Sequence, residues 1–360
     1  MGRLTEVARS SPEPQDYAGF DETDRALVHA LQIAPRASWH LVGRVLGISP
    51  VTAARRWQRL VEDRLAWVTC LPGPALWTAH VLAFIEVDCA PETLPAAIAT
   101  LTDDPRVASI EVTAGRQDLV LTVFSADLAT LSDLLGLIGR LAGVRGTRTH
   151  LGTGVYAEGA GWRLDALTPA QRDRITPGGR APRPDPAVPG PWVRELLLAC
   201  GSDGRRPVTE LAQHTGASPS SVRRRLARMT RDRLASFRCE VAIGVSGWPV
   251  SITYWVSVPA SELEATARAV ATLAEVRLCA AVTGGSSNLV VTVWLRSPGE
   301  SQRLETALVE RFPNLTVDDR SVALRIPKRI GWRLDDLGRP IGAVLIDLWH
   351  RTTGAEIASE

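Results

Sequence analysis

Residues 42–60 are VGRVLGISPVTAARRWQRL, and they predict two helices joined by a tight corner. Gly47 supplies the backbone freedom that such a corner needs, because glycine enters the left-handed region without a side-chain clash. Ser49 is placed to accept hydrogen bonds from the free amides of the second helix, and Pro50 suits the first position of that helix. The pattern is typical of a helix-turn-helix whose second helix enters a DNA groove.

The second helix of this motif is predicted to have one basic side and one apolar side. Its arginines are Arg55, Arg56 and Arg59. Its apolar residues, which we expect to face inward, are Val51, Ala54 and Leu60. Arginine suits such a surface because its planar guanidinium binds phosphates and guanine bases through paired hydrogen bonds.

The motif occurs a second time in residues 211–226, LAQHTGASPSSVRRRL. The glycine, serine and proline of the corner recur 169 residues later, as Gly216, Ser218 and Pro219. Further along, GWRLD at 161–165 recurs 170 residues later at 331–335. A nearly constant offset between distant landmarks indicates a duplicated unit, and the period is far too long for a solenoid repeat.

Basic charge is concentrated on these two motifs, although the whole chain of 360 residues carries only +2. Residues 36–66 hold six arginines and two acids, a net of +4, and residues 205–238 hold nine arginines and two acids, a net of +7. The remainder is therefore acidic. This distribution is what a phosphate-binding surface requires, whereas solvated helix faces more often interleave acids with bases.

Several protein classes are disfavoured by the composition. The five cysteines are far apart and no pair has metal-ligand spacing, so we expect buried thiols in a reducing compartment and no metal or cofactor. No stretch is long and apolar enough to span a bilayer, and residues 1–19 lack an export signal and are expected to be disordered. The predicted location is the cytoplasm, without a membrane partner.

The remaining pattern of each unit predicts an α+β fold. In the first unit, a strand at 67–70 follows the helix-turn-helix as a wing, and strands at 80–88, 107–113, 119–124 and 144–150 alternate with helices at 92–101 and 128–141. The order βαββαβ gives a ferredoxin-like sandwich with both helices on one face of the sheet. The other face is also apolar, and an uncovered apolar sheet needs a partner. We expect the two sheets of one chain to cover each other.

The predicted divisions of the chain follow from this plan. They are a winged helix-turn-helix at 20–71, a sandwich at 76–165, a linker at 168–191, a second winged helix-turn-helix at 192–242, a second sandwich at 248–335 and a tail at 341–360. The linker is rich in proline and glycine, which favours a stiffened connection without regular structure. Within the tail, residues 341–351 are compatible with a short helix.

The chain resembles the Lrp/AsnC family of transcriptional regulators, in which a winged helix-turn-helix precedes a ligand-binding sandwich called the RAM domain. The resemblance is carried by FDETD at 20–24, LGIS at 46–49, the arginine-rich helix at 55–60 and GRQDLV at 115–120. A typical member has one such unit, and this chain resembles a tandem-duplicated form. The resemblance implies a sequence-specific regulator that binds double-stranded DNA, is modulated by a small effector such as an amino acid and forms homo-oligomers.

Particular residues follow from the motifs and from the resemblance. The predicted DNA-binding residues are Ser49, Thr52, Arg55, Arg56, Arg59, Ser218, Ser220, Ser221, Arg223, Arg224, Arg225 and Arg228. The family's effector loop corresponds to Thr113, Gly115 and Asp118 in the first unit, and to Thr283, Gly285 and Asn288 in the second. A carboxylate pairs with an α-ammonium group and loop amides receive an α-carboxylate, but Asn288 lacks the charge, so the second site is expected to be altered.

Two other functions fit the same fold. The tandem arrangement also resembles siroheme decarboxylases, whose interface between RAM domains holds a tetrapyrrole and requires histidine and arginine in the cleft. His80 and His150, at predicted strand ends, are the candidates for that role. An effector-binding module without DNA activity is the third interpretation. Helix caps and arginines at both recognition helices favour the regulator, and we nominate no catalytic residue.

Overall fold

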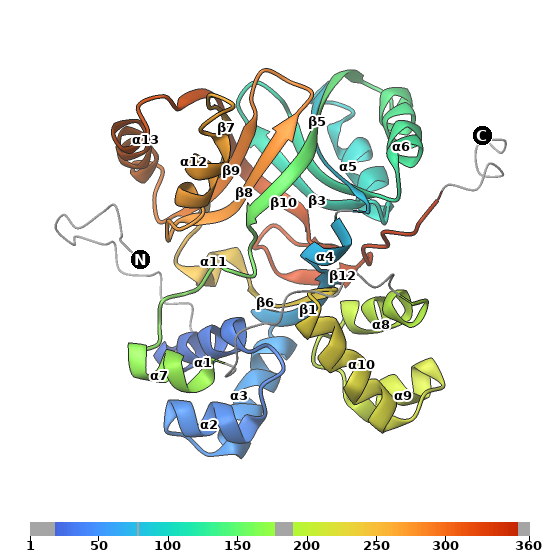
Figure 1. Ribbon diagram of the computed structural model, residues 1–360, viewed down its shortest axis with the longest axis vertical. Coiled ribbons are helices and arrows are strands. Elements are labelled where there is room, and N and C mark those ends of the chain that lie inside the picture. Colours follow the sequence, from blue (N-terminus) through green and yellow to red (C-terminus); the bar gives the residue numbers. More distant parts are fainter. Residues whose placement is uncertain (1–18, 78, 177–189, 352–360) are drawn as a thin grey trace.

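The computed structural model describes residues 19–77, 79–176 and 190–351. Three predicted segments lie largely outside the described residues. They are the N-terminal segment 1–19, predicted to be disordered, of which only Gly19 is described, most of the linker, and the last nine residues of the tail. Figure 1 shows two helical heads at one end of the molecule and a large β-structure at the other, with two short strands between them.

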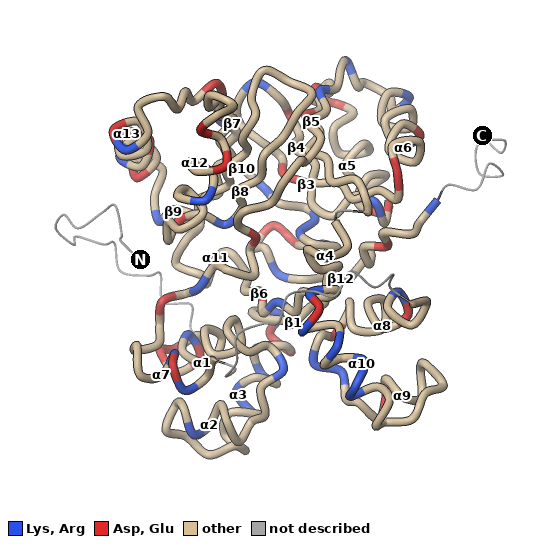
Figure 2. Tube along the Cα trace, in the orientation of Figure 1, with Lys and Arg blue, Asp and Glu red and all other residues tan. Residues whose placement is uncertain are grey.

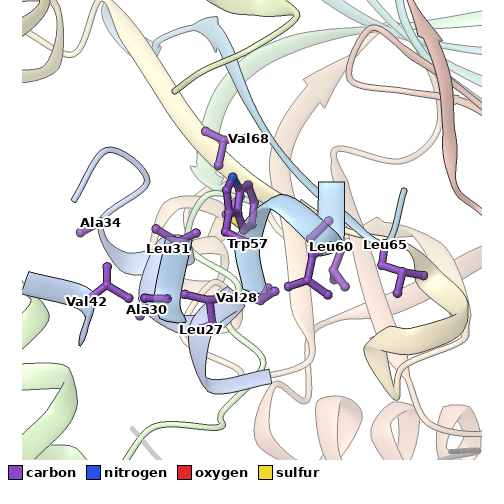
Figure 3. Close-up of a cluster of buried hydrophobic side chains, with 14 of the residues drawn as sticks. Leu27, Val28, Ala30, Leu31, Ala34, Val42, Trp57, Leu60, Leu65 and Val68 are labelled. Carbon is purple, nitrogen blue, oxygen red and sulfur yellow. The ribbon is translucent and has the colours of Figure 1, made fainter. Parts of the chain in front are cut away.

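The first head consists of α1 (Glu22–Ile33), α2 (Trp39–Leu46) and α3 (Pro50–Glu62). Each helix begins at a side-chain cap: Asp21 accepts from the Asp24 amide, Ser38 from Leu41 and Ser49 from Thr52. Gly47 ends α2 in the left-handed conformation with φ of 72°, as the sequence predicts for the corner. The helices enclose an apolar core that includes Leu27, Leu31 and Trp57 (Figure 3).

The second head repeats this plan with α8 (Trp192–Gly201), α9 (Val208–Thr215) and α10 (Pro219–Arg231). Ser218 accepts a hydrogen bond from the Ser221 amide at the start of α10, and Gly216 ends α9 with φ of 62°. The corner and cap predicted for the second copy are thus present in the same geometry as in the first.

The strands that follow the two heads pair with each other. β1 (Ala66–Pro72) and β6 (Ala235–Val241) form an antiparallel ribbon over their full length. Each strand begins under its own head and ends under the other: Val68 packs in the first core and Cys70 in the second, while Ala235 packs in the second and Cys239 in the first. The predicted wings are therefore not separate, because the apolar residues of both strands are buried only when the strands share one ribbon.

The first sandwich contains β2 (Val81–Cys89), α5 (Leu94–Asp103), β3 (Val107–Ala114), β4 (Leu119–Ser125), α6 (Leu128–Arg140) and β5 (Val144–Ala157). The second contains β7 (Val250–Ser257), α12 (Leu263–Val270), β8 (Val276–Thr283), β9 (Leu289–Leu295), α13 (Glu300–Arg311) and β10 (Thr316–Arg329). Strands lie in the order β3-β4-β2-β5 in the first unit and β8-β9-β7-β10 in the second. The molecule is thus α+β, with two tandem units of the predicted βαββαβ type.

The two sheets close into one ring, because the long last strand of each unit crosses to the other. β5 pairs with β8, and β10 pairs with both β3 and β7. Inside the ring, Leu82, Phe84, Trp255 and Val290 belong to one buried cluster drawn from both sheets. The two inner faces cover each other within one chain, as their apolar character predicts.

Smaller elements differ from the sequence predictions. The first part of the expected linker is a helix, α7 (Pro169–Ile175), which begins at a capping box formed by Thr168 and Gln171. Residues 341–351, for which a short helix was predicted, are not helical: β12 (Pro340–Ala343) pairs with β11 (Trp332–Leu334), and Leu348 is fully buried in the core of the second head. Short helices α4 (Pro74–Trp77) and α11 (Ile243–Ser246) join the ribbon to the ring. No helix in the described ranges is long and apolar enough to cross a membrane.

Candidate nucleic-acid interface and ligand sites

Of the arginines predicted to bind DNA, Arg55 on α3 and Arg223 and Arg224 on α10 are exposed. Arg231 at the end of α10 is also exposed, but its Nε lies 2.9 Å from Asp232 Oδ1. Arg55 and Arg224 occupy equivalent positions, 169 residues apart. In Figure 2 the basic positions follow α10 along much of its length, while α9 beside it carries little charge. These side chains are available to phosphates and base edges, so the two heads keep the surface that a helix-turn-helix uses.

The other two predicted arginines of α3 are held by carboxylates of the same head. Arg56 Nη1 lies 2.8 Å from Asp21 Oδ2 and 3.0 Å from Asp24 Oδ1, and Arg59 Nη2 pairs with Asp24 Oδ2. Asp24 is completely buried, whereas the side chains of Arg56 and Arg59 are 27% and 43% exposed. Their first role is therefore to fix α3 against the start of α1, because a buried carboxylate requires a charged partner.

Arg225 and Arg228 have the corresponding structural role on α10. Their guanidinium carbons lie 5.6 and 5.7 Å from the ring centre of Trp192, the first residue of α8. Arg228 also pairs with Asp232 at 3.2 Å. The concentration of arginine in the sequence thus overstates the DNA-binding charge, because part of it fastens each recognition helix to the first helix of its head.

The small polar residues at the helix starts lie beside the exposed arginines. Ser49 and Ser218 are the caps, Thr52 Oγ1 lies 2.8 Å from Ser49 Oγ, and Ser220 Oγ lies 3.1 Å from Ser218 Oγ. Ser221 is partly buried. The prediction that Val51 faces inward is wrong: it is 76% exposed at the start of α3, because the second helical position points away from the core. Its side chain is therefore part of the exposed surface of α3 rather than of the core.

A pair of equivalent arginines joins the two heads. Arg36 Nη2 donates to the Arg206 carbonyl at 3.0 Å, and Arg205 donates to the carbonyls of Pro35 and Ala37 at 2.6 and 2.8 Å. The Arg205 guanidinium also stacks on Trp39, with its central carbon 4.0 Å from the ring centre. We call this pair the arginine latch. It fixes one head relative to the other, so these two arginines are not part of a phosphate footprint.

The loop predicted to bind an effector in the first unit makes contacts within the protein. Asp118 Oδ2 accepts from the Cys89 amide at 2.8 Å and lies 3.6 Å from Arg145 Nη2. Thr113 is buried and donates to the Gln117 carbonyl at 2.6 Å. Gly115 has φ of 146°, and a side chain there would meet the Arg320 carbonyl. The predicted residues do lie together, at the junction of the two sheets.

The corresponding loop of the second unit has similar hydrogen bonds, but its glycine lies one position earlier than predicted. Asn288 Oδ1 accepts from the Val258 amide at 2.9 Å and its Nδ2 donates to the Val258 carbonyl at 2.7 Å, so the amide replaces Asp118 in a structural role. The counterpart of Gly115 is Gly284, with φ of 104°, rather than the predicted Gly285, because the loop has one additional residue. Thr283 is exposed.

An inner cavity of about 120 Å³ lies between the sheets, above the ribbon. Its walls are mainly apolar and aromatic, with Phe84, Phe124 and Trp294 among them. The charged residues that line it are Glu111, Glu158, Arg238, Arg277 and Arg329. The sequence pattern did not identify this site, because the five residues come from five strands or strand ends that are distant in the chain.

The three arginines of the inner cavity converge on Glu240. The shortest separations from this carboxylate are 2.7 Å for Arg238, 2.6 Å for Arg277 and 3.3 Å for Arg329. Burial alone would raise the pKa of Glu240, but the three guanidinium groups outweigh it and hold the pKa at about 2. Glu240 is therefore ionised, and it neutralises one of three adjacent positive charges.

Neither candidate histidine reaches this cavity. His80 Nδ1 lies 2.7 Å from the Leu76 carbonyl, and its ring meets the edge of Trp349. His150 is buried, with Nε2 2.7 Å from Glu86 Oε1 and its ring 4.4 Å from that of Trp255. Among the residues that the structure describes, the lining of the inner cavity includes no histidine.

Comparison with known families assigns the first unit. Residues 20–61 match the AsnC-type helix-turn-helix domain, and residues 82–159 match the Lrp/AsnC ligand binding domain. Residues 20–159 are therefore similar to the two domains of Lrp/AsnC transcriptional regulators. Relatives include the uncharacterized HTH-type transcriptional regulator PH0140 of Pyrococcus horikoshii, 28% identical over 138 residues, which covers 38% of this chain and 87% of the relative. The HTH-type transcriptional regulator FL11 of the same organism is 26% identical over 37% of this chain and 88% of its own length.

The whole two-unit arrangement also occurs in a solved structure. The siroheme decarboxylase NirDL, crystallised with an iron-uroporphyrin III analogue, superimposes with a TM-score of 0.55 over 86% of this chain and 93% of that chain. The sequence identity is 15%, so the similarity shows the shared fold alone.

Proposed function

We propose that the protein is a sequence-specific DNA-binding transcriptional regulator of the Lrp/AsnC type, in which both units descend from one helix-turn-helix and RAM module. The main support is that each head keeps an exposed arginine, Arg55 or Arg224, at the same position of a capped recognition helix. The named relatives of the first unit are HTH-type regulators. On this proposal, Val51, Ser220 and Arg223 lie at the DNA with the two arginines.

The proposal is tested by DNA binding at several salt concentrations, measured by fluorescence anisotropy on fragments selected from genomic DNA. Replacing Arg55 and Arg224 together with alanine should weaken binding and lower the log–log salt slope by about two, because about one unit is lost for each phosphate contact. The matched control is Arg140→Ala, which removes an exposed arginine from α6 on the ring. Equal affinity of the double variant and the control would reject the assignment of the recognition helices.

We propose that a small effector, such as an amino acid, binds at the junction of the sheets near Thr113, Gly115 and Asp118. Asp118 Oδ2 is engaged, and the side chain is 37% exposed, so Oδ1 is the oxygen placed for an α-ammonium group. The loop of the second unit is proposed as a second, uncharged site, formed by Thr283, Gly284 in place of the predicted Gly285, and Asn288. Thermal melting with single amino acids measures this binding, and Asp118→Asn should remove the shift while Asp133→Asn on α6 retains it.

The proposal extends to the assembly and location of the protein. The divisions at 20–71, 76–165, 192–242 and 248–335 are proposed as the units of the duplication, with the shared ribbon joining the two heads. Whole chains are proposed to associate further into homo-oligomers, and the compartment is proposed to be the cytoplasm, where the five buried cysteines, all free, would stay reduced.

A second candidate function is that of a siroheme decarboxylase-like enzyme. It is favoured by the similarity of the complete two-unit arrangement to NirDL. Two features of the inner cavity oppose it: the cavity of about 120 Å³ is smaller than the pockets of roughly 300–1,000 Å³ that hold drug-sized ligands, and its described lining has no histidine. Absorption spectroscopy with an iron-porphyrin carboxylate separates the two functions, and we expect no stoichiometric complex.

A further inference from the structure

The inner cavity has mainly apolar walls and one group of positively charged lining residues. Leu82, Phe84 and Phe124 are among its apolar walls, and three arginines line it together with two glutamates. Arg277 lies over Trp294, with its guanidinium carbon 3.8 Å from the ring centre, and Arg329 lies 5.2 Å from the same ring. Stacking of this kind holds the plane of a guanidinium and leaves its edge for hydrogen bonds.

The positive charge of this group exceeds what the neighbouring carboxylates neutralise. Glu240 pairs with all three arginines but carries one charge. Burial raises the pKa of Glu111 to about 7 although Arg329 and Arg277 lower it, and burial also raises the pKa of Glu158. Near neutral pH Glu111 is therefore partly protonated. The three guanidinium groups then exceed the carboxylate charge beside them, and a low-dielectric interior penalises such an excess.

Donor groups of the cluster also lack partners. Arg329 is 6% exposed, and its Nη1 has no hydrogen-bond partner among the described residues; the same holds for Arg238 Nε. Buried guanidinium groups in proteins normally have their donors satisfied. Two unsatisfied donors that belong to arginines lining one cavity indicate an anionic group as the missing partner.

We infer that the inner cavity binds a small organic anion, a carboxylate on an apolar body about as large as a benzene ring. The size follows from the cavity of about 120 Å³, since an engineered apolar cavity of about 150 Å³ holds benzene. The carboxylate lies against Arg238, Arg277 and Arg329, and the apolar body lies against the aromatic walls. This site is separate from the loop at Asp118, and the inference does not depend on DNA binding.

The test uses the complete chain and benzoate as the probe, with benzamide as an uncharged molecule of the same shape. Titration calorimetry should show saturable binding of benzoate, and benzamide should bind at least about tenfold more weakly because it lacks the charge. Arg329→Gln should weaken benzoate binding by a similar factor. Ala108→Leu should abolish it by filling the cavity with every arginine intact, and Arg140→Ala should leave it unchanged.

The pH dependence provides an independent readout of the same site. Glu111 is the titrating group, and the charged groups around the cavity are Glu158, Arg238, Glu240, Arg277 and Arg329. Because Glu111 has a pKa of about 7, it loses its proton and competes with the ligand as the pH rises. Benzoate should bind about tenfold more tightly at pH 6 than at pH 8, and Glu111→Gln should remove this difference.

Three results would overturn the inference. They are the absence of saturable benzoate binding at both pH values, equal benzoate affinity in wild type and Ala108→Leu, and a stoichiometric iron-porphyrin complex that Ala108→Leu abolishes. Thermal melting monitored by circular dichroism establishes that each variant is folded. If Arg329→Gln does not fold, Ala108→Leu and the benzamide comparison still decide the question.

Discussion

His29 on α1 is a fully buried histidine that accepts rather than donates through Nδ1. The amides of Ala166 and Leu167 donate to this atom at 2.8 and 2.9 Å, which ties the segment before α7 to the first head. Burial lowers the pKa of His29 to about 4, and Arg163 acts in the same direction. A proton on Nδ1 would abolish both hydrogen bonds, so the neutral form is the one that stabilises the fold.

This burial predicts a loss of stability in mild acid. Because the folded pKa is about 4 and the unfolded value 6.5, the unfolded chain binds the proton first, and stability falls as the pH drops from about 6.5 to about 4. The free energy of unfolding in urea should fall by about 2 kcal/mol between pH 7 and pH 5 through this group. His29→Asn keeps an acceptor near the same position and should remove that part of the pH dependence. An unchanged pH profile in the variant would contradict the assignment.

Residue patterns predicted the caps and corners well, because those features depend on a few neighbouring residues. Gly47, Ser49 and their counterparts Gly216 and Ser218 have the predicted roles. The partners of arginines were less predictable. Nothing near Arg56 in sequence identifies Asp21 and Asp24 as its partners, and the cluster around Glu240 forms only when β6, β8 and β10 meet.

The elements themselves were mostly predicted, whereas their pairing was not. Alternating apolar residues gave the strands of both sandwiches, but period-two patterns do not say which strand lies beside which. The ribbon of β1 with β6 and the crossing of β5 and β10 depend on contacts between the units. The helix α7 did have a local signal, the Thr168–Gln171 capping box before Pro169, which the proline-rich composition after it obscured.

At the element scale, the arginine latch predicts how the heads cooperate on DNA. Removing it with Arg36→Ala and Arg205→Ala takes away side-chain hydrogen bonds to four backbone carbonyls and frees the relative motion of the heads. Affinity for a DNA fragment with two half-sites should fall by about tenfold, because flexible heads lower the effective concentration of the second contact.

Two comparisons distinguish a loss of coupling between the heads from a general loss of DNA binding or folding. Affinity for a fragment with a single half-site should not change in the latch variant. Arg206→Ala is the control, since its side chain donates to Ser202 in its own head and its carbonyl, which accepts from Arg36, is retained. An equal loss on one-site and two-site fragments would show that the latch does not set the spacing.

At the scale of the whole molecule, the inner cavity lies directly against the ribbon that carries both heads. Leu71 of β1 and Arg238 of β6 line the cavity, and residues of these strands pack in the two head cores. A ligand held there contacts both strands at once. Occupancy should therefore change the relative placement of the heads and with it their affinity for DNA.

This coupling predicts a reciprocal effect between the two ligands. Saturating benzoate should change the affinity for a two-site DNA fragment at least about fivefold, and saturating DNA should change the affinity for benzoate by the same factor. Anisotropy and calorimetry measure the two sides of this cycle. If benzoate binds to the wild type without changing its affinity for DNA, the predicted coupling between the cavity and the heads is wrong.

The unequal recognition helices give the molecule a direction along its target. A symmetric dimer presents the same surface to both halves of a site and binds equally after a half-turn. Here one head offers Arg55 with Val51, and the other offers Arg223 with Arg224, on a single polypeptide. Because the two heads differ, the order of the half-sites would set the orientation of the chain on the DNA. That orientation would determine which way the ring of strands and any bound molecule face relative to the neighbouring gene.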